Sequence, residues 1–179
     1  MNLLAILLLG HLIADFPLQT NWVYRLKNHH WAGVLLHAVI HCVVTAVLLQ
    51  DTLAHWPMLI ALGSIHFATD WLKLRVEFPF QSLGFILDQI THVLALLLLA
   101  TWQSEMIGAL TPTLIHTAVG YALVPALLMF SSVMAADLEK ATSDPSSRAK
   151  NKAARFILLS QVAGLPLVVG TMIVRLSVP

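Results

Sequence analysis

The strongest constraint on this chain is a series of long apolar segments separated by short polar ones. A helix needs about 20 apolar residues to cross the roughly 30 Å hydrocarbon core of a bilayer. Unbroken apolar runs without two-residue alternation favour helices over barrel strands. The sequence therefore predicts an all-α polytopic membrane protein with six transmembrane helices. The six segments span residues 2–21, 32–50, 56–76, 83–102, 113–136 and 154–176.

The composition excludes several other classes of protein. Hydrophobic residues make up 58% of the 179 residues, charged residues make up 11%, and the mean hydropathy is +0.81. A soluble domain carries about 25% charged residues, so a water-soluble globule is excluded, as is a disordered chain. The net charge of +1 does not fit a nucleic-acid-binding protein. Because Cys42 is the only cysteine, no disulfide can form within the chain.

The lysines and arginines predict the orientation of the helices. Nine of the ten lie in or beside the first, third and fifth connections, the last being the basic segment 137–153. The positive-inside rule places these connections in the cytoplasm, so both termini are expected outside. The N-terminal segment lacks the cationic region of a signal peptide and is expected to be the first membrane helix.

Each of the first four apolar segments contains two ionisable residues spaced four positions apart. This spacing puts both members of a pair on one helix face, about one turn apart. The alternating chain direction brings all four pairs to a common depth, and the second hairpin repeats the first at an offset of 55 positions. We expect a four-helix core over residues 1–102, made of two parallel-repeat hairpins, and two scaffold helices over residues 103–179. The pairs are His11 and Asp15, His37 and His41, His66 and Asp70, and Asp88 and His92.

The energetic cost of placing these pairs within the membrane makes them a candidate metal site. An Asp at the centre of a membrane helix costs about 2.5–3.5 kcal/mol on insertion scales, so three buried carboxylates require compensation. Imidazole and carboxylate groups without a thiolate suit zinc, manganese or iron(II). We expect the eight side chains to bind one or two divalent ions, zinc first. Two alternatives remain open: a metal-free proton or ion relay, and hydrogen-bonded pairs that only hold the helices together.

The sequence also predicts roles for several residues near the pairs. Lys73 shares the face of Asp70 and is expected either to bind an anionic substrate group or to reach the lipid headgroups. Pro17 is expected to break or kink the first helix below Asp15. Polar residues beside the pairs are expected to make hydrogen bonds to them or to pack as ordinary helix residues; they are Thr69, Gln89 and Thr91. Four histidines are expected to lie outside the site: His29, His30, His55 and His116.

The quoted motifs, taken together, resemble a known family. His11-Leu-Ile-Ala-Asp15-Phe-Pro-Leu-Gln19, the pair His37 and His41, His66-Phe-Ala-Thr-Asp70-Trp-Leu-Lys73, and Asp88-Gln89 followed by His92 are similar to domain-of-unknown-function family 3307. The resemblance covers roughly residues 1–100. It implies a small bacterial inner-membrane protein and supplies no activity. The site type is also similar to that of intramembrane metallohydrolases, but their Glu-Glu pair is absent, so that activity does not transfer.

Three functions are consistent with these features. The first is a metal-dependent hydrolase acting on a lipid, a lipid-linked molecule or a membrane peptide, with Asp88 or Asp70 as general base. The second is a divalent-cation transporter or another metal-handling membrane protein. The third is a scaffold with a structural metal. The apolar character of the first four helices beyond the pairs argues against a continuous transport path.

Overall fold

A computed structural model describes residues 3–50, 52–103 and 108–141. Within these ranges it contains helices and no strand, which confirms the all-α prediction. The elements are α1 (Leu3–Asp15), α2 (Asn21–His29), α3 (Trp31–Leu48), the short 3-10 helix η1 (Thr52–His55), α4 (Trp56–Lys73), α5 (Gln81–Trp102) and α6 (Pro112–Ala141).

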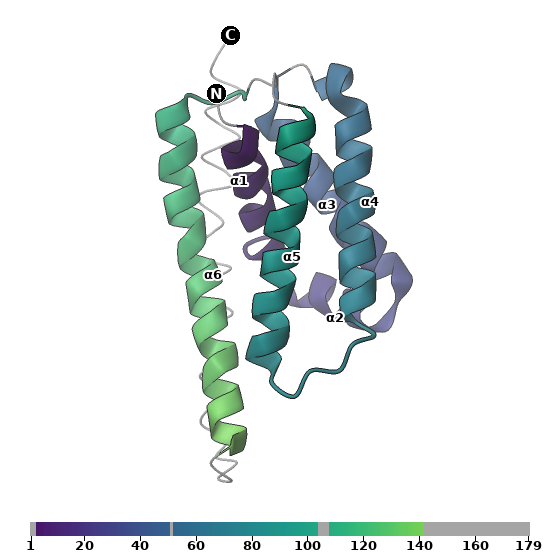
Figure 1. The fold of residues 1–179 in the computed structure, drawn as a ribbon, viewed down its shortest axis with the longest axis vertical. Helices are drawn as coiled ribbons and strands as arrows, with labels where there is room; N and C mark the ends of the chain where they lie inside the picture. The colour runs from purple at the N-terminus through teal and green to yellow at the C-terminus, as the bar shows by residue number, and fades with distance from the viewer. Residues whose placement is uncertain (1–2, 51, 104–107, 142–179) are drawn as a thin grey trace.

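Helix α1 forms the centre of the bundle. It contacts α3, α5 and α6, while α4 packs against α3 and α5 (Figure 1). Most of its residues are buried, and its leucines and isoleucines form much of the apolar core. The polar pair of α1 is therefore surrounded by helices on several sides.

Three described helices, not six, are long and apolar enough to cross a membrane: α3, α5 and α6. Helix α1 has 13 residues, which span only about 20 Å. It ends at Asp15 because Pro17 cannot continue the helical hydrogen bonding. Helix α4 has 18 residues, but the polar residues of its second half lower its hydropathy. The predicted span 154–176 lies outside the described residues.

The first connection, predicted as a loop, contains the amphipathic helix α2. The hydroxyl oxygen of Thr20 accepts a hydrogen bond from the backbone N–H of Val23 and caps its first turn. Val23 and Lys27 point inward and are buried, whereas most of the other side chains are exposed. At Gly33 a Cβ atom would overlap the backbone of Leu26, so glycine allows α3 to begin directly against α2.

The last described helix continues five residues beyond its predicted end at residue 136, into the segment predicted as a basic loop. The additional helical turn places Asp137 against the start of α5. Its carboxylate accepts hydrogen bonds from the backbone N–H groups of Gln81 and Ser82, at 3.1 Å and 2.7 Å. Two unpaired N–H groups at the start of α5 are thereby satisfied by a side chain of α6. The rest of segment 137–153 lies outside the described residues.

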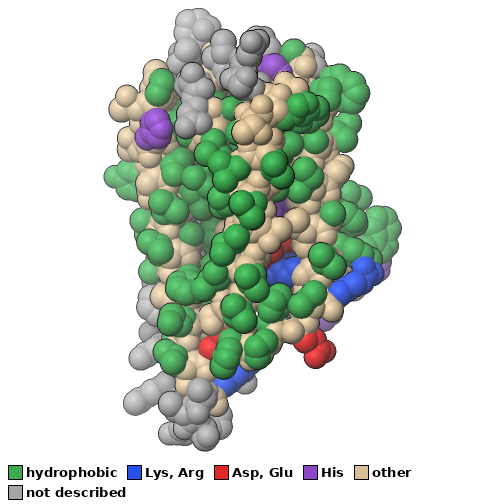
Figure 2. Space-filling model, viewed as in Figure 1, with side chains coloured by type: hydrophobic (Ala, Val, Ile, Leu, Met, Phe, Trp, Pro, Cys, Tyr) green, Lys and Arg blue, Asp and Glu red, His purple; other side chains and the backbone are tan. Residues whose placement is uncertain are grey.

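The surface of the bundle is apolar over most of its length. Figure 2 shows hydrophobic side chains covering most of one face, while the visible Lys, Arg, Asp and Glu residues lie in its lower half. Exposed large side chains include Leu94 and Leu98 of α5 and Tyr121 and Leu127 of α6. Such a surface is far more apolar than a soluble monomer exposes, and it is consistent with a lipid bilayer environment.

Candidate metal centre

The structure brings together all eight ionisable residues of the four sequence pairs. Each of α1, α3, α4 and α5 contributes one pair through a single inward face, as the four-residue spacing predicts. Each of the eight side chains has an ion-pair contact and is at most 8% exposed. A cluster of three carboxylates and five imidazoles therefore lies inside an otherwise apolar bundle.

Asp15 lies at the centre of this cluster. Its Oδ1 atom accepts hydrogen bonds from Nε2 of His37 at 2.9 Å and from Nε2 of His41 at 3.0 Å. The same oxygen lies 3.8 Å from Nε2 of His66. Its Oδ2 atom lies 3.5 Å from Nε2 of His11. One carboxylate of α1 thus connects imidazoles from three different helices.

The histidine rings pack directly against one another. The ring centroids of His41 and His66 are 3.5 Å apart, and those of His66 and His92 are 4.2 Å apart and stacked. His11 completes this layer, with its ring centroid 5.0 Å from that of His92. His37 lies beside the layer, 4.8 Å from His41. Five imidazoles from four helices thus lie close together in the interior of the bundle.

Four of these side chains have the geometry of a metal site. One donor atom from each of Asp15, His37, His41 and His66 lies within 4.8 Å of the other three. A tetrahedral zinc ion with bonds of about 2.0–2.1 Å separates its donors by roughly 3.3 Å. The distances of 2.9 Å, 3.0 Å and 3.8 Å from Asp15 Oδ1 to the three Nε2 atoms bracket that value. The cluster could hold a metal ion after small side-chain adjustments.

Unsatisfied ring nitrogens support the same interpretation. Within the described part of the chain, Nε2 of His66 and Nε2 of His92 are buried and have no hydrogen-bond partner. Nδ1 of His92 lies 3.3 Å from the hydroxyl oxygen of Thr69, which can accept its proton. That hydrogen bond leaves the lone pair of His92 on Nε2, the atom facing the cluster. Buried polar atoms without partners are rare, and a cation bound to Nε2 of His66 would satisfy that atom.

Two lysines also belong to the cluster. Nζ of Lys27 lies 2.7 Å from Oδ2 of Asp70, and Nζ of Lys73 lies 2.6 Å from Oδ2 of Asp88. Sequence reasoning treated Lys27 only as a cationic loop residue, because the loop was not expected to fold back on the core. The ammonium group of Lys73 is paired with Asp88, and its side chain is 32% exposed.

Gln89 of α5 contacts both members of the α1 pair. Its Nε2 donates to Oδ2 of Asp15 at 3.1 Å, and its Oε1 lies 3.2 Å from Nε2 of His11. The expectation that Gln89 hydrogen-bonds to the site is met. Thr91 instead donates to the backbone carbonyl of Leu87 within its own helix, on an exposed face.

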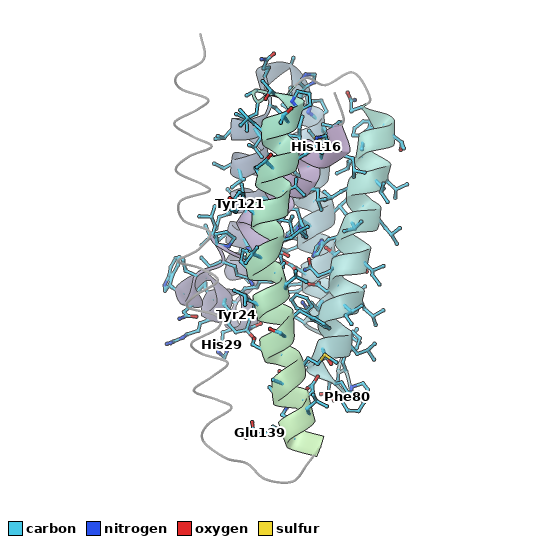
Figure 3. The ribbon with its side chains drawn as sticks, turned by 90° about the vertical axis from the view of Figure 1, so that its left-hand side faces the viewer. Tyr24, His29, Phe80, His116, Tyr121 and Glu139 are labelled. Atoms are coloured by element: carbon cyan, nitrogen blue, oxygen red, sulfur yellow. The ribbon has the colours of Figure 1, made fainter. Side chains whose placement is uncertain are left out.

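The remaining histidines and the cysteine lie outside the cluster. Figure 3 shows His116 in the upper part of α6 and His29 near α2 at the lower left. His29, His30 and His116 are exposed, and none of these or His55 joins a metal-competent group among the described residues. Sγ of Cys42 lies 3.2 Å from the backbone carbonyl oxygen of Leu59, to which it donates.

A cavity of about 380 Å³ leads to one side of the cluster. Asp15, Asp88 and Gln89 form its inner end. Its walls come from α2, from the connection between α4 and α5, and from α5 and α6. They include polar side chains, among them Lys27 and Lys73, and apolar ones. The apolar wall residues include Phe16, Phe78, Phe85, Met129 and Val133.

These features define a class of protein: a helical bundle with membrane-compatible helices and a buried His/Asp cluster that could hold a metal ion. A family model described as "Protein of unknown function (DUF3307)" matches residues 3–119, and the chain belongs to that family. The match confirms the resemblance and extends it through α5 into the start of α6. Neither the curated proteins nor the solved structures contain a match to this chain.

Proposed function

We propose that this protein binds a divalent metal ion inside the membrane and uses it to hydrolyse an amphiphilic substrate. The observation that carries the proposal is the four-donor group of Asp15, His37, His41 and His66, of which Asp15 lines a cavity. Three imidazoles and one carboxylate are a ligand set typical of zinc. Manganese and iron(II) suit the same donors, so the preference for zinc is part of the proposal.

The cavity favours an enzyme over a purely structural metal site. A structural site is closed, with all its ligands supplied by the protein, and needs no approach from outside. Here a cavity of about 380 Å³ reaches the carboxylate of Asp15 itself. If a water reached the ion through the cavity in addition to these four residues, the ion would lower the pKa of that water and polarise a carbonyl or phosphoryl oxygen. The cavity gives a substrate access to such an ion.

Asp88 is the better candidate for the general base. It lines the cavity, and one of its donor atoms lies within 4.8 Å of donor atoms of Asp15 and His92. Asp70 is 1% exposed and does not line the cavity. A base must reach the proton that it removes, so Asp88 takes this role in the proposal. Asp70 is proposed to neutralise Lys27 and to position His66, whose Nε2 is 3.3 Å from its Oδ2.

The walls of the cavity support an amphiphilic substrate. Lys27, Asn28 and Lys73 offer polar contacts, whereas Phe85 of α5 and Met129 of α6 offer apolar ones. Both α5 and α6 also have apolar surfaces suited to lipid. A lipid, a lipid-linked molecule or a membrane peptide has this combination of a polar group and an apolar chain.

We further propose that the cavity opens toward the cytoplasm of a bacterium, with the protein in the inner membrane. Arg25, Arg75 and Lys140 lie at or near the end of the bundle that contains α2, and the positive-inside rule assigns that end to the cytoplasm. The inner-membrane location follows from the family resemblance.

Transport of the metal is the second candidate, and the described packing does not favour it. Beyond the cluster, toward the start of α1, the core consists of apolar residues such as Ile6, Leu7 and Met58. A transport path requires polar groups that continue toward both faces of the membrane. The hydrolase therefore remains the proposed function.

The test uses purified protein in liposomes made from a bacterial inner-membrane lipid extract, with lipid products followed by mass spectrometry. Metal-loaded protein should form new hydrolysis products, and chelation should stop their formation. Asp88→Asn should retain the metal and lose turnover by at least about 100-fold, the size of a general-base effect. Activity that survives chelation, or equal activity of the variant, would contradict the hydrolase. Metal flux without products would support the transporter.

A further inference from the structure

The eight donors of the cluster divide into two sets of four. Asp15, His37, His41 and His66 form the group whose donor atoms lie close together, and we call them the first set. The second set comprises His11, Asp70, Asp88 and His92. Nε2 of His92 lies 3.6 Å from Oδ1 of Asp70 and 3.5 Å from Oδ1 of Asp88. Because a tetrahedral ion needs four donors, the number of donors alone would allow two ions.

The two sets differ in their cationic partners. Both carboxylates of the second set are paired with lysines, Asp70 with Lys27 at 2.7 Å and Asp88 with Lys73 at 2.6 Å. The carboxylate of the first set, Asp15, contacts only imidazoles and Gln89 among the described side chains. Counting the carboxylates and lysines alone, the first set keeps an unneutralised negative charge, while the two carboxylates of the second set are balanced by the two ammonium groups.

The position of the two ammonium groups is fixed by the fold. Lys27 comes from α2, and its side chain is 9% exposed; Lys73 ends α4, and its side chain is 32% exposed. The nearly buried charge of Lys27 persists only beside an opposite charge, and removing one partner leaves the other uncompensated. Each ammonium group contacts the Oδ2 atom of its carboxylate, on the side away from the Oδ1 atom that faces His92.

We propose that the centre is mononuclear, because Lys27 and Lys73 act as built-in cations in the place of a second metal ion. The inference rests on the proposed binding of one ion by the first set. A single bound ion is consistent with the charge balance of the cluster. Three carboxylates and two ammonium groups leave one net negative charge, which one divalent ion converts to one net positive charge. Without the lysines, two divalent ions would give the same net charge.

The experiment counts zinc ions per chain. Wild-type protein and the double variant Lys27→Met with Lys73→Met are purified in detergent, loaded with zinc, desalted and analysed for metal and protein. The wild type should contain one zinc ion per chain, and the double variant should contain two. The matched control, Lys27→Arg with Lys73→Arg, keeps both charges and should contain one. Lys27→Met with Asp70→Asn removes a charged pair together and should also contain one.

Each outcome decides the inference. A folded double variant with one zinc ion, or a wild type with two, would overturn it while leaving the metal site in place. No zinc in any variant would instead overturn the proposed function. If the double variant folds only when zinc is present, two bound ions support the inference, because the second ion has replaced the lysines. Failure to fold even with saturating zinc would contradict it.

Discussion

The ammonium group of Lys27 lies 2.7 Å from a carboxylate oxygen of Asp70, in a buried ion pair between α2 and α4. This contact makes the short amphipathic helix α2 a part of the polar cluster. Burial of such a pair is favourable only when both partners are held in good geometry. The packing that positions α2 therefore controls the charge of the cluster.

Gly33 is the residue through which this packing can be tested. A Cβ atom there would overlap the backbone of Leu26, so Gly33→Ala should push α2 away from α3. We expect a loss of about 1–3 kcal/mol in stability, the usual cost of overpacking. Thermal unfolding in detergent measures it. Gly120→Ala is the control, because nothing lies within 4 Å of its added Cβ and stability should stay equal or rise slightly. Equal effects of the two substitutions would contradict this account of α2.

Asp15 is predicted to be essential for metal binding. Asp15→Asn keeps the size of the side chain but removes the negative charge that contacts His37 and His41. Metal affinity, measured by competition with a chromophoric chelator, should fall by more than about 100-fold, beyond the range typical of residues that only support a ligand. Asp137→Asn changes a carboxylate that caps α5 outside the cluster and should leave the affinity unchanged. Similar affinities for both variants would remove Asp15 from the site.

Gln89 is predicted to position Asp15 without binding the metal. Gln89→Leu removes its hydrogen bond to Asp15 and its contact with His11. The metal affinity should fall by about 10–100-fold, while the number of ions bound at saturation stays the same. Titration calorimetry separates these two quantities. Gln81→Leu alters another amide of the cavity wall and serves as the control, with no expected change. If Gln89→Leu binds fewer ions at saturation than the wild type, Gln89 is a metal ligand.

The orientation in the membrane can be tested with single cysteines. In a Cys42→Ser background, Glu77→Cys marks the connection between α4 and α5, and Ala54→Cys marks the opposite end of α4. Both positions are exposed. A membrane-impermeant maleimide should label the cysteine at position 54 in cells with only the outer membrane permeabilised, and the one at 77 only after cell lysis. The reverse pattern would invert the proposed topology.

Local spacing explains why the cluster could be predicted from the sequence. Residues four apart share a helix face wherever the helix packs, so pairs such as His66 and Asp70 were placed together correctly. Among the described residues, fewer helices can span a membrane than predicted, because the apolar window of the first segment runs across Pro17, where α1 has already ended, and because polar residues lower the hydropathy of α4. The division into domains at residue 102 stays a prediction, since residues 142–179 are not described.

The lysines of the cluster required tertiary information. Lys27 lies in a segment that is polar overall, and its inward direction depends on α2 forming and packing against Gly33. Lys73 was placed on the correct face from its spacing to Asp70, but its partner, Asp88, lies on another helix. Gln89 also required tertiary information, because its neighbours in sequence do not indicate that its side chain contacts His11 and Asp15.

X-ray absorption spectroscopy of the zinc-loaded protein tests the central claim most directly, because it reports the atoms bound to the metal. The account predicts three imidazole nitrogens and one carboxylate oxygen at about 2.0–2.1 Å in the wild type, from His37, His41, His66 and Asp15, together with one water oxygen. The imidazole signal should be lost together with the metal in Asp15→Asn. A zinc ion surrounded only by oxygen atoms, or a sulfur ligand, would contradict the account.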